Sequence, residues 1–361
     1  MKEYFRPIKT DRLITPMNQV FSIMKGIAII SVVARHAYIR GFSENVFNQY
    51  HLAVFFFISS HFFKEKYFDS PLDFIKKRIK LLYIPFIELG ILFILSHNFL
   101  YQIHLELNCL SIQVTKRKLF ILSSFDIVES YMDAIWYCPA LCISSILILF
   151  ALKPFKCNEQ KQLFTTLSIY ILGGILIRHV GHYFLFIHQS MMYSFIILTV
   201  FEFRKNESYF QNKRLLWFLP IFSLTFLLIT TYYGINARLQ LHMISWYKYL
   251  YIPIISTIGC IGLYSLIKLI STYKIGKVTA HIGEYSFSII CLHFLVFRFI
   301  NLLQRYLTNR PISEAAAHPY IEYNNILWYF IYLIAGVVIS IKTTRIYQYS
   351  SKKFLQLPKQ A

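Results

Sequence analysis

The sequence predicts an all-α integral membrane protein, a bundle of about ten transmembrane helices with both termini in the cytoplasm. Its composition is 56% apolar and 15% charged, whereas a soluble domain has about 45–50% apolar and about 25% charged residues. Apolar stretches close to the roughly 20 residues of a membrane span recur along the chain. Lysine and arginine gather in the segments between these stretches, as they do in loops that face the cytoplasm.

The first apolar stretch follows a basic N-terminal segment, an arrangement that a signal peptide shares. Because the stretch contains Lys25, Arg35 and His36 and lacks a small-residue cleavage site, we interpret it as a retained helix. In the second stretch the uninterrupted apolar part covers only residues 52–63, which is short enough for a re-entrant segment, so a full span is left open there. The other stretches end at charges, Pro, Gly or Asn. The predicted helices cover residues 20–39, 46–63, 81–100, 133–152, 163–178, 184–201, 215–232, 247–270, 285–302 and 325–341.

The formal charge of +20 would suggest a nucleic acid partner in a soluble protein, but its distribution indicates a membrane topology instead. About 25 of the 37 lysine and arginine residues lie in alternate segments, and the opposite segments carry about eight. The lipid bilayer is therefore an expected partner, and nucleic acid is not. The segments predicted to be cytoplasmic are residues 1–19, 64–80, 153–162, 202–214, 268–279 and 342–361, which include both ends.

Nothing in the sequence divides the chain, which has neither an internal repeat of 20–50 residues nor a Pro/Gly/Ser-rich linker. We therefore predict a single domain over residues 1–361. The longest non-cytoplasmic segment, 101–132, mixes polar and apolar residues and is expected to be either a lid or a simple loop. The scattered cysteines show no paired spacing and no histidine partners, so neither a metal site nor a disulfide framework is predicted.

Two ionisable residues in the first predicted helix are the leading site candidates, because such groups inside a membrane usually face a partner or a water-filled cavity. His36 follows Lys25 by eleven residues, roughly 16 Å along the axis and close to three turns, so both project from one face. This spacing is consistent with a cation that binds an anionic group and an imidazole that takes a hydroxyl proton. Alternatively, Lys25 snorkels to the headgroups and His36 is an interfacial residue beside Arg35.

A second set of candidates lies in the basic segment at residues 74–86, which follows the aromatic run at residues 50–63. Arg78, with Lys77 and Lys80 beside it, could contact the phosphates of a polyphosphorylated donor. The alternative is an ordinary positive-inside loop.

Glu88 in the third predicted helix is an intramembrane carboxylate. It could orient His36, or pair with Lys25 or Arg78, in the way that carboxylates orient histidines and balance cations. A purely structural ion pair is the alternative.

Four segments, in this order along the chain, together resemble the acyltransferase 3 family, membrane acyltransferases that O-acetylate surface polysaccharides and related acceptors. KGIAIISVVARH at 25–36 fits the family pattern of Lys or Arg, ten residues and His. YHLAVFFFISSHFF at 50–63 is similar to its histidine followed by an aromatic run. FIKKRIKLLYIPF at 74–86 resembles its basic segment, and IGEYSFSIICLH at 282–293 resembles its late helix signature, which ends in histidine.

The match has departures as well as a weaker fifth element. Ser60 stands where the family usually has glycine, and Leu81 stands where it often has a second arginine. Trp136 matches a tryptophan that often precedes an apolar helix in the family.

The resemblance implies acetyl-CoA or a related acyl-CoA as donor and cosubstrate, with no metal, and a hydroxyl of a saccharide or lipid-linked saccharide as acceptor. It also implies a multi-pass protein of the bacterial inner membrane, as a monomer or homodimer. His36 would deprotonate the acceptor hydroxyl or carry the acyl group itself, with Lys25 and Glu88 as its catalytic neighbours. The CoA phosphates would lie against Arg78 and Lys77, with Lys25 as a third possible contact. Lys80 is a further donor-binding candidate, and the remaining candidates are His51, Ser59, Ser60, Trp136 and His293, of which Ser59, Ser60 and His293 could stabilise an oxyanion.

Two other functions fit a bundle with cationic positions. A transporter or flippase of a lipid-linked saccharide would use Lys25, Glu88 and His36 as substrate contacts, but matching halves with broken helices are not evident in the sequence. A membrane scaffold that has lost activity would tolerate the departures at Ser60 and Leu81.

Overall fold

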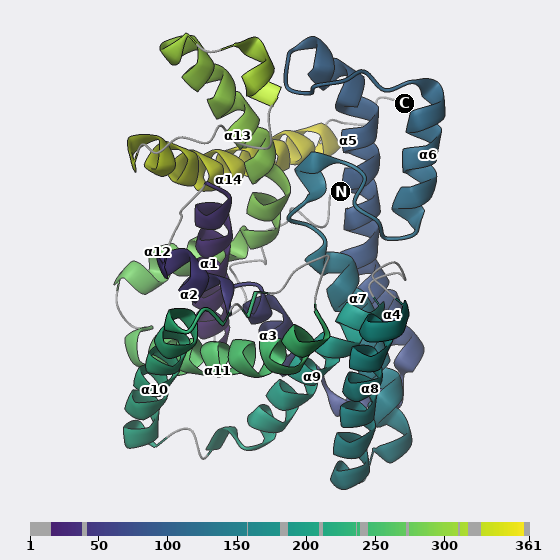
Figure 1. The fold of residues 1–361 in the computed structure, drawn as a ribbon, viewed down its shortest axis with the longest axis vertical. Coiled ribbons are helices and arrows are strands. Elements are labelled where there is room, and N and C mark those ends of the chain that lie inside the picture. The colour runs from purple at the N-terminus through teal and green to yellow at the C-terminus, as the bar shows by residue number, and fades with distance from the viewer. Residues whose placement is uncertain are drawn as a thin grey trace. The chain divides into compact units, whose positions relative to one another are not determined.

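The structure, a computed structural model, describes residues 16–37, 42–156, 158–180, 187–208, 212–235, 237–238, 245–271, 274–309, 311–316 and 326–356. Regular secondary structure within these ranges is entirely helical (Figure 1). The all-α class is therefore confirmed. The predicted cytoplasmic ends lie partly outside the described residues, and their side of the membrane stays a prediction.

The chain forms two compact units, each assembled from separate stretches of sequence. Unit 1 comprises residues 1–39, 87–135 and 278–361, and unit 2 comprises residues 40–86 and 136–277. Because the units interleave along the chain, they are not consecutive domains, and a single domain over 1–361 stays a prediction.

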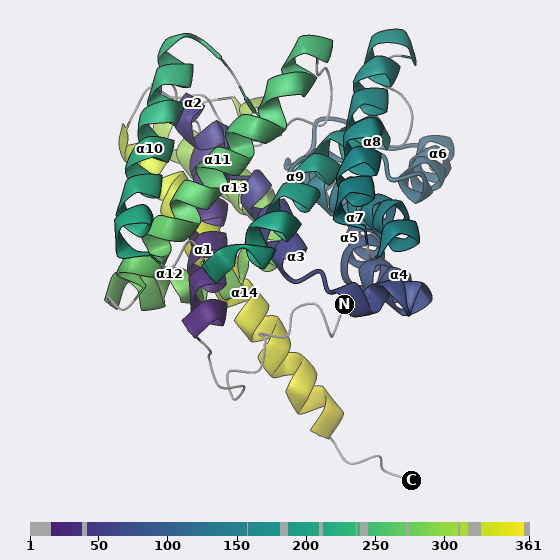
Figure 2. The same ribbon diagram turned by 90° about the horizontal axis from the view of Figure 1, so that it is seen from below.

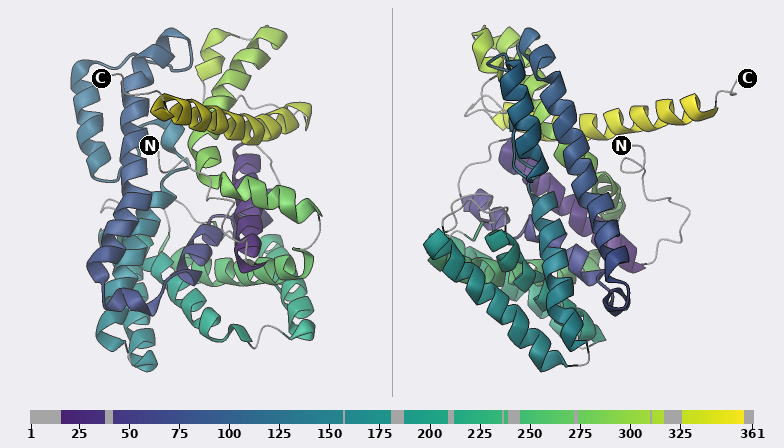
Figure 3. Two further views of the ribbon diagram at one scale, coloured as in Figure 1. Left: turned by 180° about the vertical axis from the view of Figure 1, so that it is seen from behind. Right: turned by 90° about the vertical axis from the view of Figure 1, so that its right-hand side faces the viewer.

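Unit 1 contains the first helix and the last ones. Its helices α13 and α14 cross steeply, as the opposite views in Figures 1 and 3 show. Tyr332 of α14 anchors this crossing, because its buried hydroxyl contacts the side-chain oxygens of Asn301 and Gln304 of α13 at 2.6 and 2.8 Å. The elements of unit 1 are α1 (Pro16–His36), α5 (Ile84–Gln102, from residue 87), α6 (Ile112–Ser123), η3 (Ser130–Met132), α12 (Lys274–Glu284, from residue 278), α13 (Ser286–Thr308), η6 (Ile312–Ala316) and α14 (Ile326–Gln356).

Unit 2 has its core where the aromatic run of α3 packs against α9. Phe56 contacts Tyr193 there, with ring centroids 4.5 Å apart. Helices α7 and α8 also pack on α9 (Figure 2). The elements of unit 2 are α2 (Phe42–Asn48), α3 (Ala53–His61), η1 (Glu65–Phe68), α4 (Pro71–Arg78), the π-helical turn η2 (Ile79–Tyr83), α7 (Tyr137–Leu152), η4 (Lys153–Phe155), α8 (Glu159–Val180), α9 (Ile187–Lys205), α10 (Lys213–Tyr232) and α11 (Trp246–Ile270).

The number of predicted spans needs correction. Among the described residues, seven helices are long and apolar enough to cross a membrane, not the ten that the sequence predicted. The described parts of α8 and α9 are not among them, since charged and amide side chains occupy residues 159–162 and 202–205. The seven are Asn18–His36, Pro71–Gln102, Tyr137–Phe155, Lys213–Tyr232, Trp246–Ile270, Ser286–Thr308 and Ile326–Ser350.

The second predicted span, 46–63, is broken into two short helices. α2 has 7 residues and α3 has 9, which gives lengths of about 10 and 14 Å against a hydrocarbon core of about 30 Å. The break follows from Gln49, whose buried amide donates to Thr231 Oγ1 at 2.7 Å and accepts from Thr230 Oγ1 at 2.8 Å. These bonds to α10 hold the amide in a turn between the helices.

The segment at 101–132 is more ordered than a simple loop. It contains α6, whose first turn is capped by Ser111, and it returns along α5 (Figure 1). Asn98 of α5 pairs with the backbone of Leu110 in both directions, at 3.0 and 2.8 Å. The segment is therefore attached to α5 within unit 1.

Candidate functional site

Helix α1 presents its two site candidates on one face. It runs without a break from Pro16 to His36, so the eleven residues between Lys25 and His36 keep their helical spacing of roughly 16 Å. Both side chains are half-buried.

A close approach of α1 to α12 sets the position of this face. An ideal Cβ on Gly26 would lie 2.0 Å from the carbonyl oxygen of Thr279, and one on Gly283 would lie 1.9 Å from that of Ser22. Only glycine permits such an approach of backbone to backbone. The residues next to these glycines, Lys25 and Glu284, are thereby brought near each other.

Glu284 is the carboxylate that acts electrostatically on Lys25. It also lies 3.6 Å from His281 Nδ1, one turn earlier on α12. Sequence reasoning did not single out Glu284, although it lies inside the quoted segment at 282–293. The signal that could have identified it is the Gly283–Glu284 pair, a small residue beside a charge in a late helix. The predicted partner, Glu88, lies half-buried on α5, and its pairing stays a prediction.

His293 of α13 lies beside His36. The two imidazole ring centroids are 5.4 Å apart, and Phe294 packs its edge against His36 at 4.6 Å. His293 is fully buried, and its Nδ1 lies 2.9 Å from the carbonyl oxygen of Ile289. Because a carbonyl only accepts, Nδ1 carries the proton in the neutral ring and Nε2 carries the lone pair. Among the described residues, Nε2 has no hydrogen-bond partner.

This tautomer changes the role predicted for His293. A group that stabilises an oxyanion must donate a hydrogen bond, but Nε2 of a neutral His293 can only accept one. His293 is therefore suited to receive a proton or an N–H beside His36.

The two sequence motifs of unit 1 thus run alongside each other. Lys25 lies near Glu284 at one end, and His36 lies near His293 at the other. The face contains Lys25 in the electrostatic field of Glu284 at one end and an imidazole pair at the other, with apolar packing from Phe294.

In unit 2, Arg78 is the best-defined of the basic candidates. Its Nη1 donates to Ser59 Oγ of α3 at 2.7 Å, and its guanidinium lies 4.8 Å from the ring centroid of Phe74. No carboxylate forms an ion pair with it in the described part of the chain. The π-helical turn η2 begins immediately after it, and such turns often occur at functional sites.

The other candidates of unit 2 have more ordinary surroundings. Lys77 is exposed and donates to Tyr67 Oη at 3.2 Å, and Lys80 is exposed as well. Ser60 donates to Phe56 O of its own helix at 2.6 Å, so its proton is already used. His51 Nδ1 lies 2.7 Å from Phe47 O, and Trp136 is buried against Tyr193.

A second polar group in unit 2 was not found from the sequence. Glu207, just after α9, accepts from Tyr264 Oη and lies 3.0 Å from Lys268 Nζ. Burial alone would raise the pKa of the Glu207 carboxyl, yet the bonds from Tyr264 and Lys268 hold that pKa below its usual value. Its charge is therefore balanced within the unit.

Metal-type side chains converge at one place in the described residues. One donor atom each of His97, Glu106 and Glu129 lies within 4.8 Å of the others. None of these residues belongs to the predicted site.

Comparisons with known proteins add one match. The sequence model of a family described as an acyltransferase domain matches residues 18–345, nearly the whole chain. No curated protein and no solved structure matches the chain. The match covers all four motifs of the sequence analysis and confirms the resemblance on which they were interpreted.

Proposed function

Because the chain belongs to this acyltransferase family, we propose that it transfers an acyl group, in the simplest case acetyl, from a cytoplasmic acyl-CoA to a hydroxyl of a saccharide or lipid-linked saccharide. The protein is a multi-pass membrane acyltransferase. The donor, the acceptor and a bacterial inner membrane as its location are the proposed parts.

The observation that carries the proposal is the imidazole pair of His36 and His293. General-base catalysis needs a neutral imidazole within reach of the proton it abstracts and a group that orients it. His293 offers a buried lone pair beside His36, which can accept an N–H from that ring.

The reaction then needs few groups. The acceptor oxygen attacks the thioester carbon while its proton passes to His36. The carbon–sulfur bond breaks, and the proton passes to the CoA thiolate as it leaves. In the covalent variant, His36 first takes the acyl group and then yields it to the acceptor oxygen.

Arg78 is the residue proposed to bind the donor phosphates. A guanidinium makes bidentate contacts with phosphate, and Ser59 fixes one of its nitrogens. The lack of a carboxylate partner among the described residues leaves its charge available to an anionic ligand.

The test is acyl transfer in membranes supplied with acetyl-CoA labelled in the acetyl group. His36→Gln should lower the transfer rate by about 10²–10⁴-fold, the usual contribution of a general base. His104→Gln is the matched control, because His104 is an exposed histidine of the same unit; it should leave the rate unchanged. Normal turnover by His36→Gln would reject the catalytic assignment of His36, whereas the absence of acyl transfer by the unmodified chain would favour a transporter.

The acceptor is tested separately. Surface glycans from cells with and without the gene should differ by one O-acetyl group. Identical glycans would reject a saccharide acceptor while leaving acyl transfer itself intact.

A further inference from the structure

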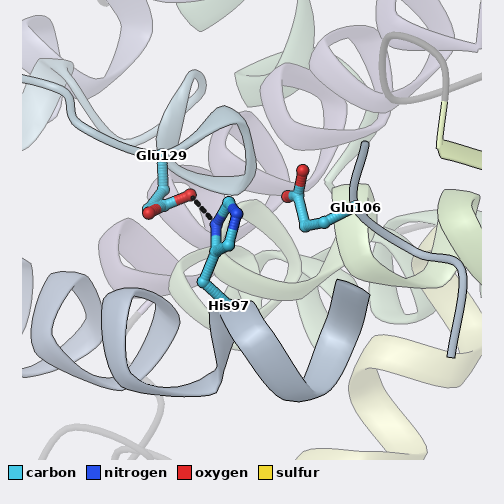
Figure 4. Close-up of side chains that lie close together, drawn as sticks. All are labelled: His97, Glu106 and Glu129. Carbon is cyan, nitrogen blue, oxygen red and sulfur yellow. Dashed lines mark hydrogen bonds and ion pairs between the residues drawn. The ribbon is translucent and has the colours of Figure 1, made fainter. Parts of the chain in front are cut away.

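His97, Glu106 and Glu129 come from three places in unit 1 and face one another (Figure 4). His97 is on α5, Glu106 is in the turn after α5, and Glu129 immediately precedes η3. His97 Nδ1 lies 3.0 Å from Glu129 Oε2, and Figure 4 shows the Glu106 carboxylate directed at the other side of the imidazole.

Each of the three side chains is held by a contact on another atom. His97 Nε2 lies 2.9 Å from the carbonyl oxygen of Asn108, Glu129 Oε1 lies 2.8 Å from Lys118 Nζ, and Glu106 Oε1 lies 3.5 Å from Ser130 Oγ. Partners of this kind orient metal ligands and fix the histidine tautomer. One donor atom of each side chain lies within 4.8 Å of a donor atom of each of the other two.

The His97 ring is in a position that requires a positive charge beside it. The Asn108 carbonyl only accepts, so Nε2 carries a proton and the neutral ring directs its Nδ1 lone pair at Glu129 Oε2. Two lone pairs 3.0 Å apart repel unless a cation lies between them. That separation suits two neighbouring ligands of one metal ion, each at about 2.0–2.1 Å from it.

The two carboxylates of the cluster differ in their ionic partners. Glu129, with its side chain 2% exposed, has Lys118 as its ammonium partner. Glu106 forms no ion pair in the described part of the chain. The buried guanidinium of Arg298 donates to Ser130 Oγ, which lies 3.5 Å from Glu106 Oε1, so the cation nearest this carboxylate acts through a hydroxyl and not by direct contact.

A buried arginine, Arg298, bonds to the residues next to Glu106 and Glu129. Arg298 of α13 donates to Leu105 O at 3.1 Å and to Ser130 Oγ at 3.2 Å, and these two residues are the neighbours of Glu106 and Glu129. Tyr131 Oη also donates to Leu105 O, at 2.7 Å. The two carboxylate-bearing segments are thus joined by the fold itself, before any cation binds.

We propose that His97, Glu106 and Glu129 bind one divalent cation, and that this ion fastens the segment 103–132 to α5. One imidazole nitrogen and two carboxylate oxygens are ligands that Zn²⁺ and Mn²⁺ accept. The segment 101–132, interpreted from the sequence as a lid or a loop, is in this proposal a cap of unit 1: its part after α5, residues 103–132, is attached to α5 by the metal ion. The proposal is independent of the acyl-transfer chemistry.

The experiment uses the full chain purified in detergent, stripped with a chelator and titrated with Zn²⁺ by calorimetry and with Co²⁺ by visible absorption. One equivalent should bind, and Zn²⁺ should raise the thermal unfolding midpoint. His97→Gln and Glu129→Gln should weaken binding by at least about tenfold, because each removes a ligand. Absence of one-equivalent binding to the unmodified chain overturns the proposal without reference to any variant.

Two controls separate this site from other ligands of the same segment. His104→Gln and Cys109→Ser replace an exposed imidazole and an exposed thiol nearby, and both should bind Zn²⁺ as the unmodified chain does. If either control abolishes binding, or if His97→Gln and Glu129→Gln bind normally, the assignment is wrong. If Zn²⁺ leaves the unfolding midpoint of the unmodified chain unchanged, the proposal fails.

Discussion

The two units surround their candidate cations differently. In unit 1, the Glu284 carboxylate acts electrostatically on Lys25, which we therefore call the matched cation. In unit 2, Arg78 meets a hydroxyl and an aromatic ring and forms no ion pair with the described residues. A matched cation is suited to hold helices together, whereas an unmatched one is suited to an anionic ligand. We therefore expect Arg78, more than Lys25, to bind an anionic donor.

The largest expected effect concerns the imidazole pair of unit 1. His293→Phe keeps an aromatic ring in a site packed by Phe294 and Phe297, but it removes the lone pair beside His36. The acyl-transfer rate should fall by roughly 10²-fold, within the range of acid–base contributions, with little change in the KM for the donor. Steady-state kinetics in membranes measures both. An equal rate in His293→Phe would reduce His293 to a packing residue.

The next effect tests whether the close approach of α1 and α12 sets the matched pair. Gly283→Ala places a methyl group 1.9 Å from the Ser22 carbonyl oxygen, and overpacking of this kind costs about 1–3 kcal/mol. Thermal unfolding in detergent should show a lowered midpoint. Gly174→Ala is the control, because a Cβ there lies 3.4 Å from Tyr249, an ordinary contact, and it should leave the midpoint unchanged or raised.

A smaller effect is expected at the unmatched cation. Arg78→Ala should raise the donor KM by about tenfold, equivalent to the roughly 1.4 kcal/mol that a charge-assisted contact contributes. Acceptor preference should be unaffected. Rates measured over a range of acetyl-CoA concentrations test this. An unaltered donor KM would contradict the donor-binding role of Arg78, and with it the proposed difference between Arg78 and Lys25.

The smallest effects separate Arg78 from its neighbours. Ser59→Ala removes the hydrogen bond from Nη1 and should raise the donor KM by only a fewfold, since the guanidinium loses one orienting contact and keeps its charge. Lys77→Ala changes an exposed side chain and should alter the KM by less than about twofold, as exposed charges do. A larger effect of Lys77→Ala than of Arg78→Ala would place the donor phosphates at the exposed lysine instead.

Helical content and membrane character followed from the sequence because apolar length and charge placement are local properties. The unbroken helix under Lys25 and His36 was predictable for the same reason. The second predicted span failed because hydropathy does not register Gln49, whose bonds to α10 come from 180 residues away. An apolar run was correctly seen, but its continuity depended on a distant partner.

The residues of the candidate site were likewise predictable from the sequence, whereas their surroundings were not. Lys25, His36 and His293 could be singled out, since spacing and family resemblance mark each of them individually. Their surroundings could not be assigned: Glu284, which acts electrostatically on Lys25, was not singled out, and the tautomer of His293 depends on the Ile289 carbonyl. His97 and Glu129, 32 residues apart, carry no local pattern.

The amino-acid order thus determined the class of protein, the family and the residues able to do chemistry, because composition, periodicity and motif spacing are written along one chain. The tertiary structure decided which of those residues meet. Ion pairs, tautomers and ligand clusters depend on distances of about 3 Å between groups from different helices, and packing sets those distances. Only the tertiary structure shows three of the features discussed above: the attachment of the segment 103–132 to α5, the cluster around His97, and the lack of an ion pair for Arg78 among the described residues.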